Sequence, residues 1–212
     1  MNFSVEEVLG ATGGRLIQGG KDISFQGVST DSRTISEGEL YIALTGPRFD
    51  GHHYALEALE KEAAGVVVEE EKSRDIHWNG HQSKAVILVR DTLQALGDLA
   101  RQRRRRYPVP VVALTGSNGK TTSKEMVAAC LETKFPVLKN RGNWNNLIGL
   151  PLTLLRLTEE ERVVVLEMGM NVPGEIRRLT EIAEPDVGLI TNIQRVHLEG
   201  LGSLERLKEE KG

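Results

Sequence analysis

The first half of the chain has short apolar runs separated by polar turn residues. Ser4-x-x-Glu7 predicts a capping box, in which each of these two side chains satisfies a free amide at the start of a helix. Continuous β-branched runs predict buried strands, and apolar residues at helical spacing predict a second helix. The predicted elements are a helix from Ser4 to about Gly13-Gly14, strands at 23–29, 39–44, 66–68 and 86–89, a helix at 53–64, and a surface loop or hairpin at 69–83.

From residue 109 the pattern becomes a regular alternation of strands and helices. Such alternation predicts a parallel sheet covered on both faces, with ligands at the carboxyl ends of its strands. The predicted elements are strands at 109–114, 135–138, 163–168 and 187–193, and helices at 123–133, 147–157, 174–183 and from 203 onward. Asp91 caps a further helix that runs to about Arg105. We therefore expect two α/β domains, 1–90 and 109–212, joined by a linker helix at 91–108.

The segment that follows the strand at 109–114 carries the strongest chemical signal. It reads Thr115-Gly116-Ser117-Asn118-Gly119-Lys120-Thr121-Thr122. A strand, a glycine turn and a helix form a cradle for phosphates, because the backbone N–H groups and the helix N-terminus face the anion. Lys120 can reach the β- and γ-phosphates, and the Thr121 hydroxyl can ligate a phosphate-bound Mg²⁺. All eight residues are candidate ligands of a nucleoside triphosphate.

This loop departs from the general P-loop pattern at one position. Leu114 stands where the pattern has its first glycine, which leaves Gly116-x-x-Gly119-Lys120-Thr121. The alternative interpretation is an ordinary strand-to-helix turn. The strand before the loop and the helix after it favour the phosphate site.

Polar residues follow two later strands at the same predicted sheet edge. Glu167 ends an apolar strand and is well placed to bind Mg²⁺, and His197 follows the next strand after a short turn. The run Gly142-Asn143-Trp144-Asn145-Asn146 is equally consistent with a loop that caps a helix and with polar groups that line a substrate channel. We interpret the other four histidines, at 52, 53, 77 and 81, as surface or structural residues.

Composition narrows the class of protein. The 212 residues carry a formal net charge of −3, which argues against a nucleic-acid partner. The sequence predicts neither a membrane-spanning segment nor a signal peptide, and Cys130 is the only cysteine. We interpret Cys130 as a small core residue and the basic run 101–106 as a solvated helix end. A monomeric cytoplasmic enzyme without membrane insertion fits these features.

Several motifs together resemble the Mur ligases. The phosphate loop resembles the variant loop of this family, which also lacks the first P-loop glycine. The dipeptide-adding branch is favoured by Gly142–Asn146 with Gly149-Leu150-Pro151-Leu152-Thr153, by Leu166-Glu167-Met168-Gly169 with Gly174-Glu175-Ile176, and by His197-Leu198-Glu199-Gly200 with Gly202-Ser203. Upstream, Thr30-Asp31-Ser32-Arg33 and Arg48-Phe49-Asp50-Gly51-His52 resemble the family's uridine-nucleotide-binding domain.

The resemblance implies an α/β fold and an ATP-dependent amide ligation. A small N-terminal α/β substrate domain would be followed by an incomplete P-loop-type parallel-sheet ATP-binding domain. The rest of that domain and a C-terminal domain would be absent, so we expect an inactive fragment. In the intact enzyme, ATP and Mg²⁺ would convert the carboxylate of UDP-N-acetylmuramoyl-tripeptide into an acyl phosphate. The amine of D-alanyl-D-alanine would then displace phosphate.

The resemblance also implies roles for individual residues. Lys120 would stabilise phosphate charge, Thr121 would hold one Mg²⁺, and Glu167 with His197 would hold a second. Lys211 matches a family lysine that can be carbamylated. The implied substrate-binding residues are Ser29, Asp31, Ser32, Arg33, Thr45, Arg48, Asp50, Asn143, Asn145 and Asn146.

Three alternatives remain open at the level of sequence. They are the sister ligase that adds the third peptide residue, a folylpolyglutamate-synthetase-like ligase, and a non-catalytic nucleotide-binding module. A P-loop GTPase is disfavoured because the sequence has no Asn-Lys-x-Asp motif.

Overall fold

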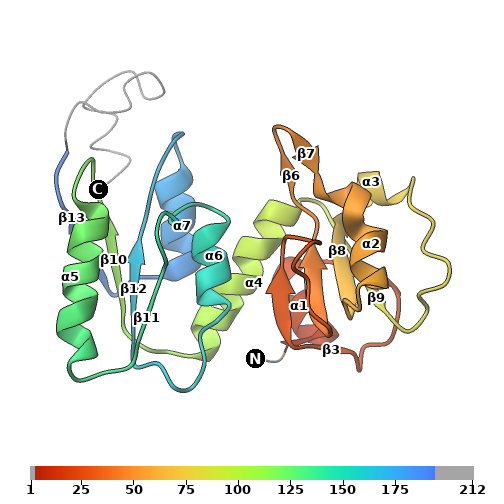
Figure 1. The fold of residues 1–212 in the computed structure, drawn as a ribbon, viewed down its shortest axis with the longest axis horizontal. Helices are drawn as coiled ribbons and strands as arrows, with labels where there is room; N and C mark the ends of the chain where they lie inside the picture. The colour runs from red at the N-terminus through yellow and green to blue at the C-terminus, as the bar shows by residue number, and fades with distance from the viewer. Residues whose placement is uncertain (1–2, 194–212) are drawn as a thin grey trace. The chain divides into compact units, whose positions relative to one another are not determined.

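The computed structural model describes residues 3–193, and the chain divides into two compact units, 1–99 and 100–212 (Figure 1). Each unit has its own sheet and its own hydrophobic core. The predicted α/β fold class is therefore confirmed. Between residues 3 and 193, no helix combines the length and the apolar character that a membrane crossing requires.

Unit 1 is built on a five-stranded sheet of order β2-β9-β8-β5-β4, in which only β2 runs antiparallel to its neighbour. Its sheet strands are β2 (Arg15–Gln18), β4 (Gly27–Ser29), β5 (Glu39–Ile42), β8 (Gly65–Glu69) and β9 (Ala85–Val89). Two small antiparallel pairs join β1 (Phe3–Ser4) to β3 (Ser24–Phe25) and β6 (Thr45–Gly46) to β7 (Phe49–Asp50). The helices are α1 (Val5–Thr12), a 3₁₀ turn (Gly51–Tyr54), α2 (Ala55–Glu60) and α3 (Glu70–Ser73).

Local sequence signals account for several of these elements. The capping box at Ser4 is confirmed, with the Glu7 amide donating to the Ser4 hydroxyl over 3.1 Å and the Ser4 amide to the Glu7 carboxylate over 2.7 Å. Gly13 ends α1 in the left-handed conformation. The predicted loop at 69–83 is wrong in part, because its first residues form α3.

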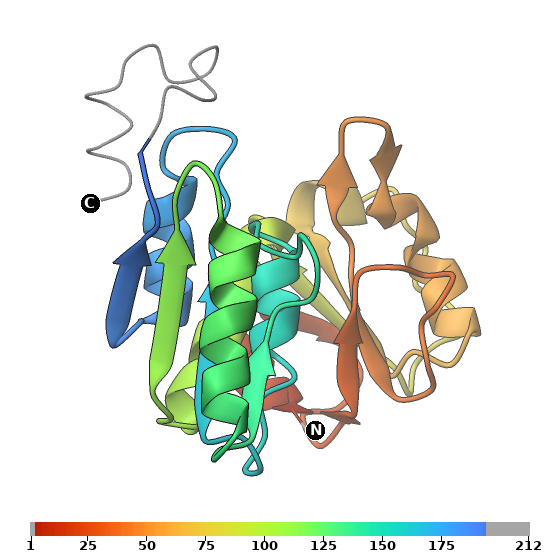
Figure 2. The same ribbon diagram turned by 60° about the vertical axis from the view of Figure 1, so that its left-hand side comes forward.

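Unit 2 is a four-stranded parallel sheet of order β11-β12-β10-β13. Its strands are β10 (Val111–Thr115), β11 (Val137–Lys139), β12 (Val163–Glu167) and β13 (Val187–Ile190). The helices are α5 (Lys120–Glu132), α6 (Gly149–Leu154) and α7 (Glu175–Ala183). Helix α5 lies on one face of the sheet and α7 on the other (Figure 2). The helix predicted from residue 203 lies outside the described residues.

Helix α4 (Thr92–Arg106) spans the boundary between the two units, and the Gln94 amide donates to Asp91 as predicted. The interpretation of its basic end as solvated is wrong in part, because Arg103 and Arg104 are buried whereas Arg105 and Arg106 are exposed. Arg103 donates to the carbonyl of Leu157, and Arg104 to that of Ala183. These guanidinium groups serve as structural hydrogen-bond donors in unit 2.

Cys130 also departs from its predicted place. It lies on α5 but is exposed, and the neighbouring position Ala128 faces the core instead. Helical periodicity places these two residues about 200° apart around the axis, so only one of them can face the sheet.

Candidate functional site

The phosphate loop joins the end of β10 to the start of α5, as the sequence pattern predicts. Gly116 has φ of +148°, and a Cβ atom there would lie 2.0 Å from the Thr191 hydroxyl oxygen. Gly119 has φ of +77° and is the N-cap of α5. Both glycines are required by backbone geometry, since a side chain at either position would be strained.

The loop is tied to the residues that follow β13. The Ser117 amide donates to the Asn192 carbonyl over 2.9 Å, and the Asn118 amide donates to the Asn192 side chain over 3.0 Å. The amides at 119–122 form the start of a 13-residue helix, where backbone donors have no acceptor within the helix. A helix N-terminus with such donors binds phosphate and other anions.

Lys120 and Thr121 extend from the first turn of α5. The Lys120 ammonium group donates to the carbonyls of Gly116 (2.9 Å) and Ser117 (3.4 Å), which holds it against the loop. The Thr121 hydroxyl donates to Glu167 Oε2 over 2.8 Å. The structure therefore brings together the threonine and the carboxylate that the sequence nominated as metal ligands.

Glu167 ends β12 and is 2 % exposed. Its other carboxylate oxygen, Oε1, accepts from the Asn145 side chain over 2.7 Å. These two hydrogen bonds to the carboxylate come from the Thr121 hydroxyl and the Asn145 amide group, which are both neutral donors. A buried carboxylate beside a hydroxyl group suits Mg²⁺, which prefers hard oxygen ligands.

The asparagines at 143, 145 and 146 differ in their contacts, and the sequence left open whether they cap a helix or line a substrate channel. Asn146 accepts from the amides of Ile148 and Gly149 at the start of α6, which is a capping role. Asn145 contacts Glu167 at the site, whereas Asn143 is exposed.

Sequence reasoning missed two buried residues behind Glu167. Asn140 and Lys124 are both fully buried. The Asn140 side chain bonds to the backbone of Glu167, and the Lys124 ammonium group donates to the Asn140 carbonyl over 2.7 Å. No local motif marks either residue, because their roles depend on contacts across the sheet.

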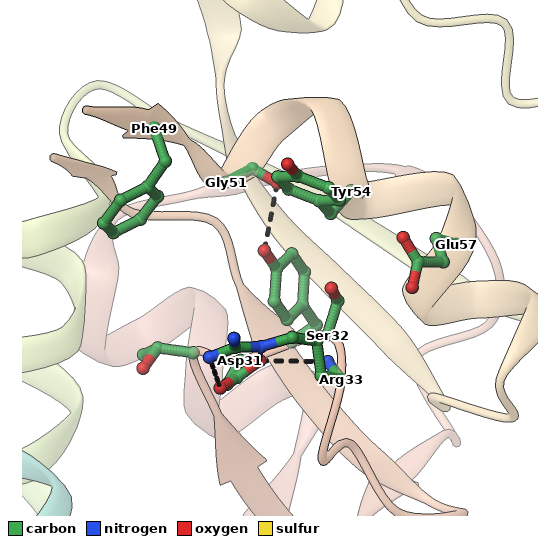
Figure 3. Close-up of a pocket in the computed structure, with 9 residues that line it drawn as sticks. Asp31, Ser32, Arg33, Phe49, Gly51, Tyr54 and Glu57 are labelled. Atoms are coloured by element: carbon green, nitrogen blue, oxygen red, sulfur yellow. Dashed lines mark hydrogen bonds and ion pairs between the residues drawn. The ribbon is translucent and has the colours of Figure 1, made fainter.

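A second candidate site is a cavity of about 550 Å³ in unit 1 (Figure 3). It is lined by Thr30, Asp31, Ser32, Arg33, Tyr41, Phe49, Gly51, Tyr54 and Glu57. Arg33 donates to both carboxylate oxygens of Asp31, over 2.9 and 2.7 Å. The Arg33 side chain and amide bonds lower the pKa of Asp31 to about 2, so this carboxylate stays ionised.

Aromatic rings form the opposite side of this cavity, where Figure 3 shows Phe49 and Tyr54 above the Asp31–Arg33 segment. These two rings are 56 % and 44 % exposed, which leaves their faces available for stacking. Tyr41 is buried, donates to the Gly51 carbonyl over 3.0 Å, and has its pKa raised by burial to about 12. The sequence analysis included Phe49 only as part of the motif Arg48–His52 and nominated none of these rings as a substrate-binding residue, because aromatic residues carry no local signal for ligand contact.

The other nominated substrate residues lie outside the lining of this cavity. The Ser29 hydroxyl accepts from the Asp31 amide and so shapes the loop behind it. Thr45 and Asp50 pair across the β6–β7 hairpin, and Arg48 is exposed in its turn. Burial would raise the pKa of Asp50, but Lys72 and His52 lower it below its usual range.

His52 is structural, as the sequence analysis allowed. Its ring is buried, with Nδ1 2.6 Å from Asp50 and Nε2 accepting from the Glu69 amide over 3.0 Å. His197 and Lys211, the other two nominated catalytic residues, lie outside the described residues.

A phosphate loop on a parallel sheet, with a threonine and a carboxylate beside it, defines a nucleotide-binding domain of the P-loop type. The profile of the Mur ligase middle domain matches residues 114–212, and that of the Mur ligase family catalytic domain matches residues 24–104. The chain belongs to the Mur ligase family.

Its relatives narrow the resemblance further. The chain is 45 % identical over 185 residues to UDP-N-acetylmuramoyl-tripeptide--D-alanyl-D-alanine ligase of Bacillus subtilis. The aligned region covers 87 % of this chain and 39 % of that protein. The crystal structure of MurF from Acinetobacter baumannii matches with a TM-score of 0.89 and 34 % identity, over 100 % of this chain and 45 % of that one.

A MurF ligase from Thermotoga maritima in complex with ADP matches with a TM-score of 0.78 and 37 % identity, over 87 % of this chain and 42 % of that one. The chain thus spans less than half the length of the relatives that it matches.

Proposed function

We propose that this chain forms the acceptor-binding and phosphate-binding part of an ATP-dependent ligase. The enzyme would join D-alanyl-D-alanine to UDP-N-acetylmuramoyl-tripeptide in peptidoglycan precursor synthesis. The observation that carries this proposal is the contact between Thr121 and Glu167 beside the phosphate loop. The names of the relatives supply the substrate class.

The residues of unit 2 would position the triphosphate for attack. The start of α5 and the Lys120 ammonium group would neutralise negative charge on the β- and γ-phosphates. Thr121 and Glu167 would hold Mg²⁺, which supplies further charge neutralisation when bound. His197 and Lys211 stay proposals for the second metal site.

The chemistry needs alignment more than a nucleophilic side chain. A carboxylate oxygen of the tripeptide attacks the γ-phosphorus atom, the bond to the β–γ bridging oxygen breaks, and ADP leaves. The amine of the dipeptide then attacks the acyl carbon. Loss of a proton from nitrogen and of inorganic phosphate from carbon completes the amide. The dipeptide site belongs to parts of the enzyme beyond this chain in the proposal.

The cavity of unit 1 would receive the uridine diphosphate end of the acceptor. Phe49 and Tyr54 offer ring faces to a pyrimidine, and Arg33 offers a fixed positive charge to a phosphate. The cavity volume is in the usual range for a small-molecule site. In this proposal the enzyme acts as a monomer in the cytoplasm, where ATP is supplied.

Two variants in different units test the proposal by calorimetric titration of the 212-residue chain. We expect Lys120→Ala to weaken ADP binding about 10-fold or more, because a charge-assisted bond is lost, while UDP binding is unchanged. Tyr54→Ala should weaken UDP binding about 2- to 10-fold through lost stacking and leave ADP binding unchanged.

Matched controls are Lys134→Ala, two residues after the end of α5, and Phe135→Ala, a part-exposed ring in unit 2. Neither should alter the affinity for either ligand. Wild-type chain that binds neither UDP nor ADP would refute the proposal. Loss of both affinities in one variant would show unfolding rather than a site effect.

A further inference from the structure

Asn140 directly follows β11 and is 0 % exposed. Its side-chain oxygen accepts from the Glu167 amide over 2.9 Å. Its side-chain nitrogen donates to the carbonyls of Glu167 and Trp144, each over 2.9 Å. Both amide protons and the oxygen are therefore satisfied, which a fully buried asparagine requires.

The side chain of Asn140 continues a strand pairing that the backbone has ended. Strands β11 and β12 pair in parallel up to Lys139 and Val165. Asn140 is one residue after Lys139, and Glu167 is two residues after Val165. The side-chain amide of Asn140 bonds to both the N–H and the C=O of Glu167, as a peptide group of a paired strand would. The backbone of Glu167 is thereby held on the β11 side after the ladder stops.

Lys124 holds Asn140 in turn. Its ammonium group is fully buried, donates to the Asn140 carbonyl over 2.7 Å, and lies 3.1 Å from the Glu125 carboxylate. Burying an ammonium group is unfavourable unless it is paired and hydrogen-bonded. Lys124 lies on α5, one turn after Thr121, so one helix contacts the Glu167 carboxylate directly and supports its backbone through Asn140.

We propose that Asn140, supported by Lys124, is a positioning residue that holds the Glu167 carboxylate in the position required to bind a divalent cation. This inference rests on the proposed function. Asn140 acts through Glu167, because its side-chain bonds go to the backbone at Glu167 and Trp144. A metal ligand must be held within about 0.5 Å of its productive position, and a bidentate backbone contact at the ligand's own residue supplies that restraint.

The test compares ADP binding to the 212-residue chain with and without Mn²⁺, which serves as a probe for Mg²⁺. The measured quantity is the metal gain, the ratio of the ADP affinity with Mn²⁺ to that in EDTA. We expect Glu167→Gln to abolish most of the gain. Asn140→Ala should reduce it about 10-fold or more and leave the metal-free affinity within about twofold. In the Glu167→Gln background, Asn140→Ala should have no further effect on the gain.

Thr153→Val is the matched control. Thr153 is 1 % exposed and its hydroxyl donates to the Gly149 carbonyl over 2.8 Å, so this variant removes a buried hydrogen bond that does not involve Glu167 or Asn140. This variant should lower the melting temperature and keep the wild-type gain. Should Asn140→Ala not fold, Lys124→Met is the second variant, with a smaller reduction of the gain expected.

The inference is overturned if folded Asn140→Ala, or Lys124→Met in its place, keeps the wild-type gain. It is also overturned if the metal-free affinity falls as much as the metal-bound affinity, because the phosphate loop itself would then be altered. A wild-type chain with no metal gain would count against the proposed function and its metal site. The two failures are therefore distinguishable.

Discussion

At the scale of single residues, Arg33 and Asp31 form a pair that depends on pH in a defined direction. The folded state lowers the pKa of Asp31 from 3.8 to about 2, chiefly through the Arg33 side chain. A lowered carboxylate pKa means that the pair stabilises the fold above about pH 4 and loses this effect as the pH falls through about 2. The net effect is small, because the Arg33 side chain is 83 % exposed and water screens the pair.

We therefore expect Asp31 to remain mostly ionised at about pH 3 in the wild-type chain. In Arg33→Ala the side-chain bonds are lost and only the amide bond of residue 33 remains, so the pKa of Asp31 should rise toward its ordinary value and more of this carboxyl should be protonated at that pH. Carbon-13 chemical shifts of the Asp31 carboxyl report this titration directly. Identical titration in the two proteins would contradict the assigned cause of the shift, and Arg48→Ala on the nearby hairpin is the control.

Sequence reasoning was uneven at this scale. Thr121 could be nominated from the phosphate-loop motif, and Glu167 because it ends a parallel strand at the same sheet edge. Asn140 could not, since its three bonds depend on where β11 stops relative to β12. Tyr54 was missed for a similar reason: the cavity that it lines combines segments from β4 to α2 that the fold brings together.

At the scale of elements, a buried arginine of the basic run on α4 donates hydrogen bonds to the end of α7. Arg104 donates to the carbonyls of Ala183 and Glu184, which end α7. The last carbonyls of a helix have no partner within it, so a buried guanidinium group beside them satisfies otherwise unpaired acceptors. The sequence pattern predicted that the arginines at 101–106 lie at the end of their own helix, α4. The structure shows that Arg104 also lies beside the end of a second helix, α7.

Replacement of Arg104 by methionine should therefore destabilise unit 2. We expect a loss of about 1.5–3 kcal/mol in the free energy of unfolding, the value typical of hydrogen bonds from a charged donor. Urea titration followed by circular dichroism measures the change. Arg105→Met is the neighbouring control, because that side chain is 59 % exposed and water screens its pair with Glu184, so the loss of stability should be much smaller. Equal losses in the two variants would argue against the capping role.

At the scale of the whole chain, each unit has its own sheet, core and candidate site. The alternation of strands and helices in unit 2 was predictable because apolar periodicity and glycine turns are local signals. Unit 1 was harder, since β2, β6 and β7 have four residues or fewer and too little pattern to recognise. Its cavity is lined in part by β7 and by the 3₁₀ turn that follows it, which explains why only part of its lining could be nominated.

The division into units predicts two separate footprints of ligand binding. We expect UDP to slow amide hydrogen exchange in the segments around Asp31 and Tyr54 in unit 1, and ADP with Mg²⁺ to slow it at residues 115–122 and around Glu167 in unit 2. Ligand binding raises the free energy of the local openings through which buried amides exchange, and each ligand contacts one unit in the proposal. Exchange measured by mass spectrometry at peptide resolution resolves these segments. Tyr54→Ala should weaken only the first footprint and Lys120→Ala only the second. Protection of the phosphate loop by UDP alone would contradict the assignment of the two ligands to separate sites.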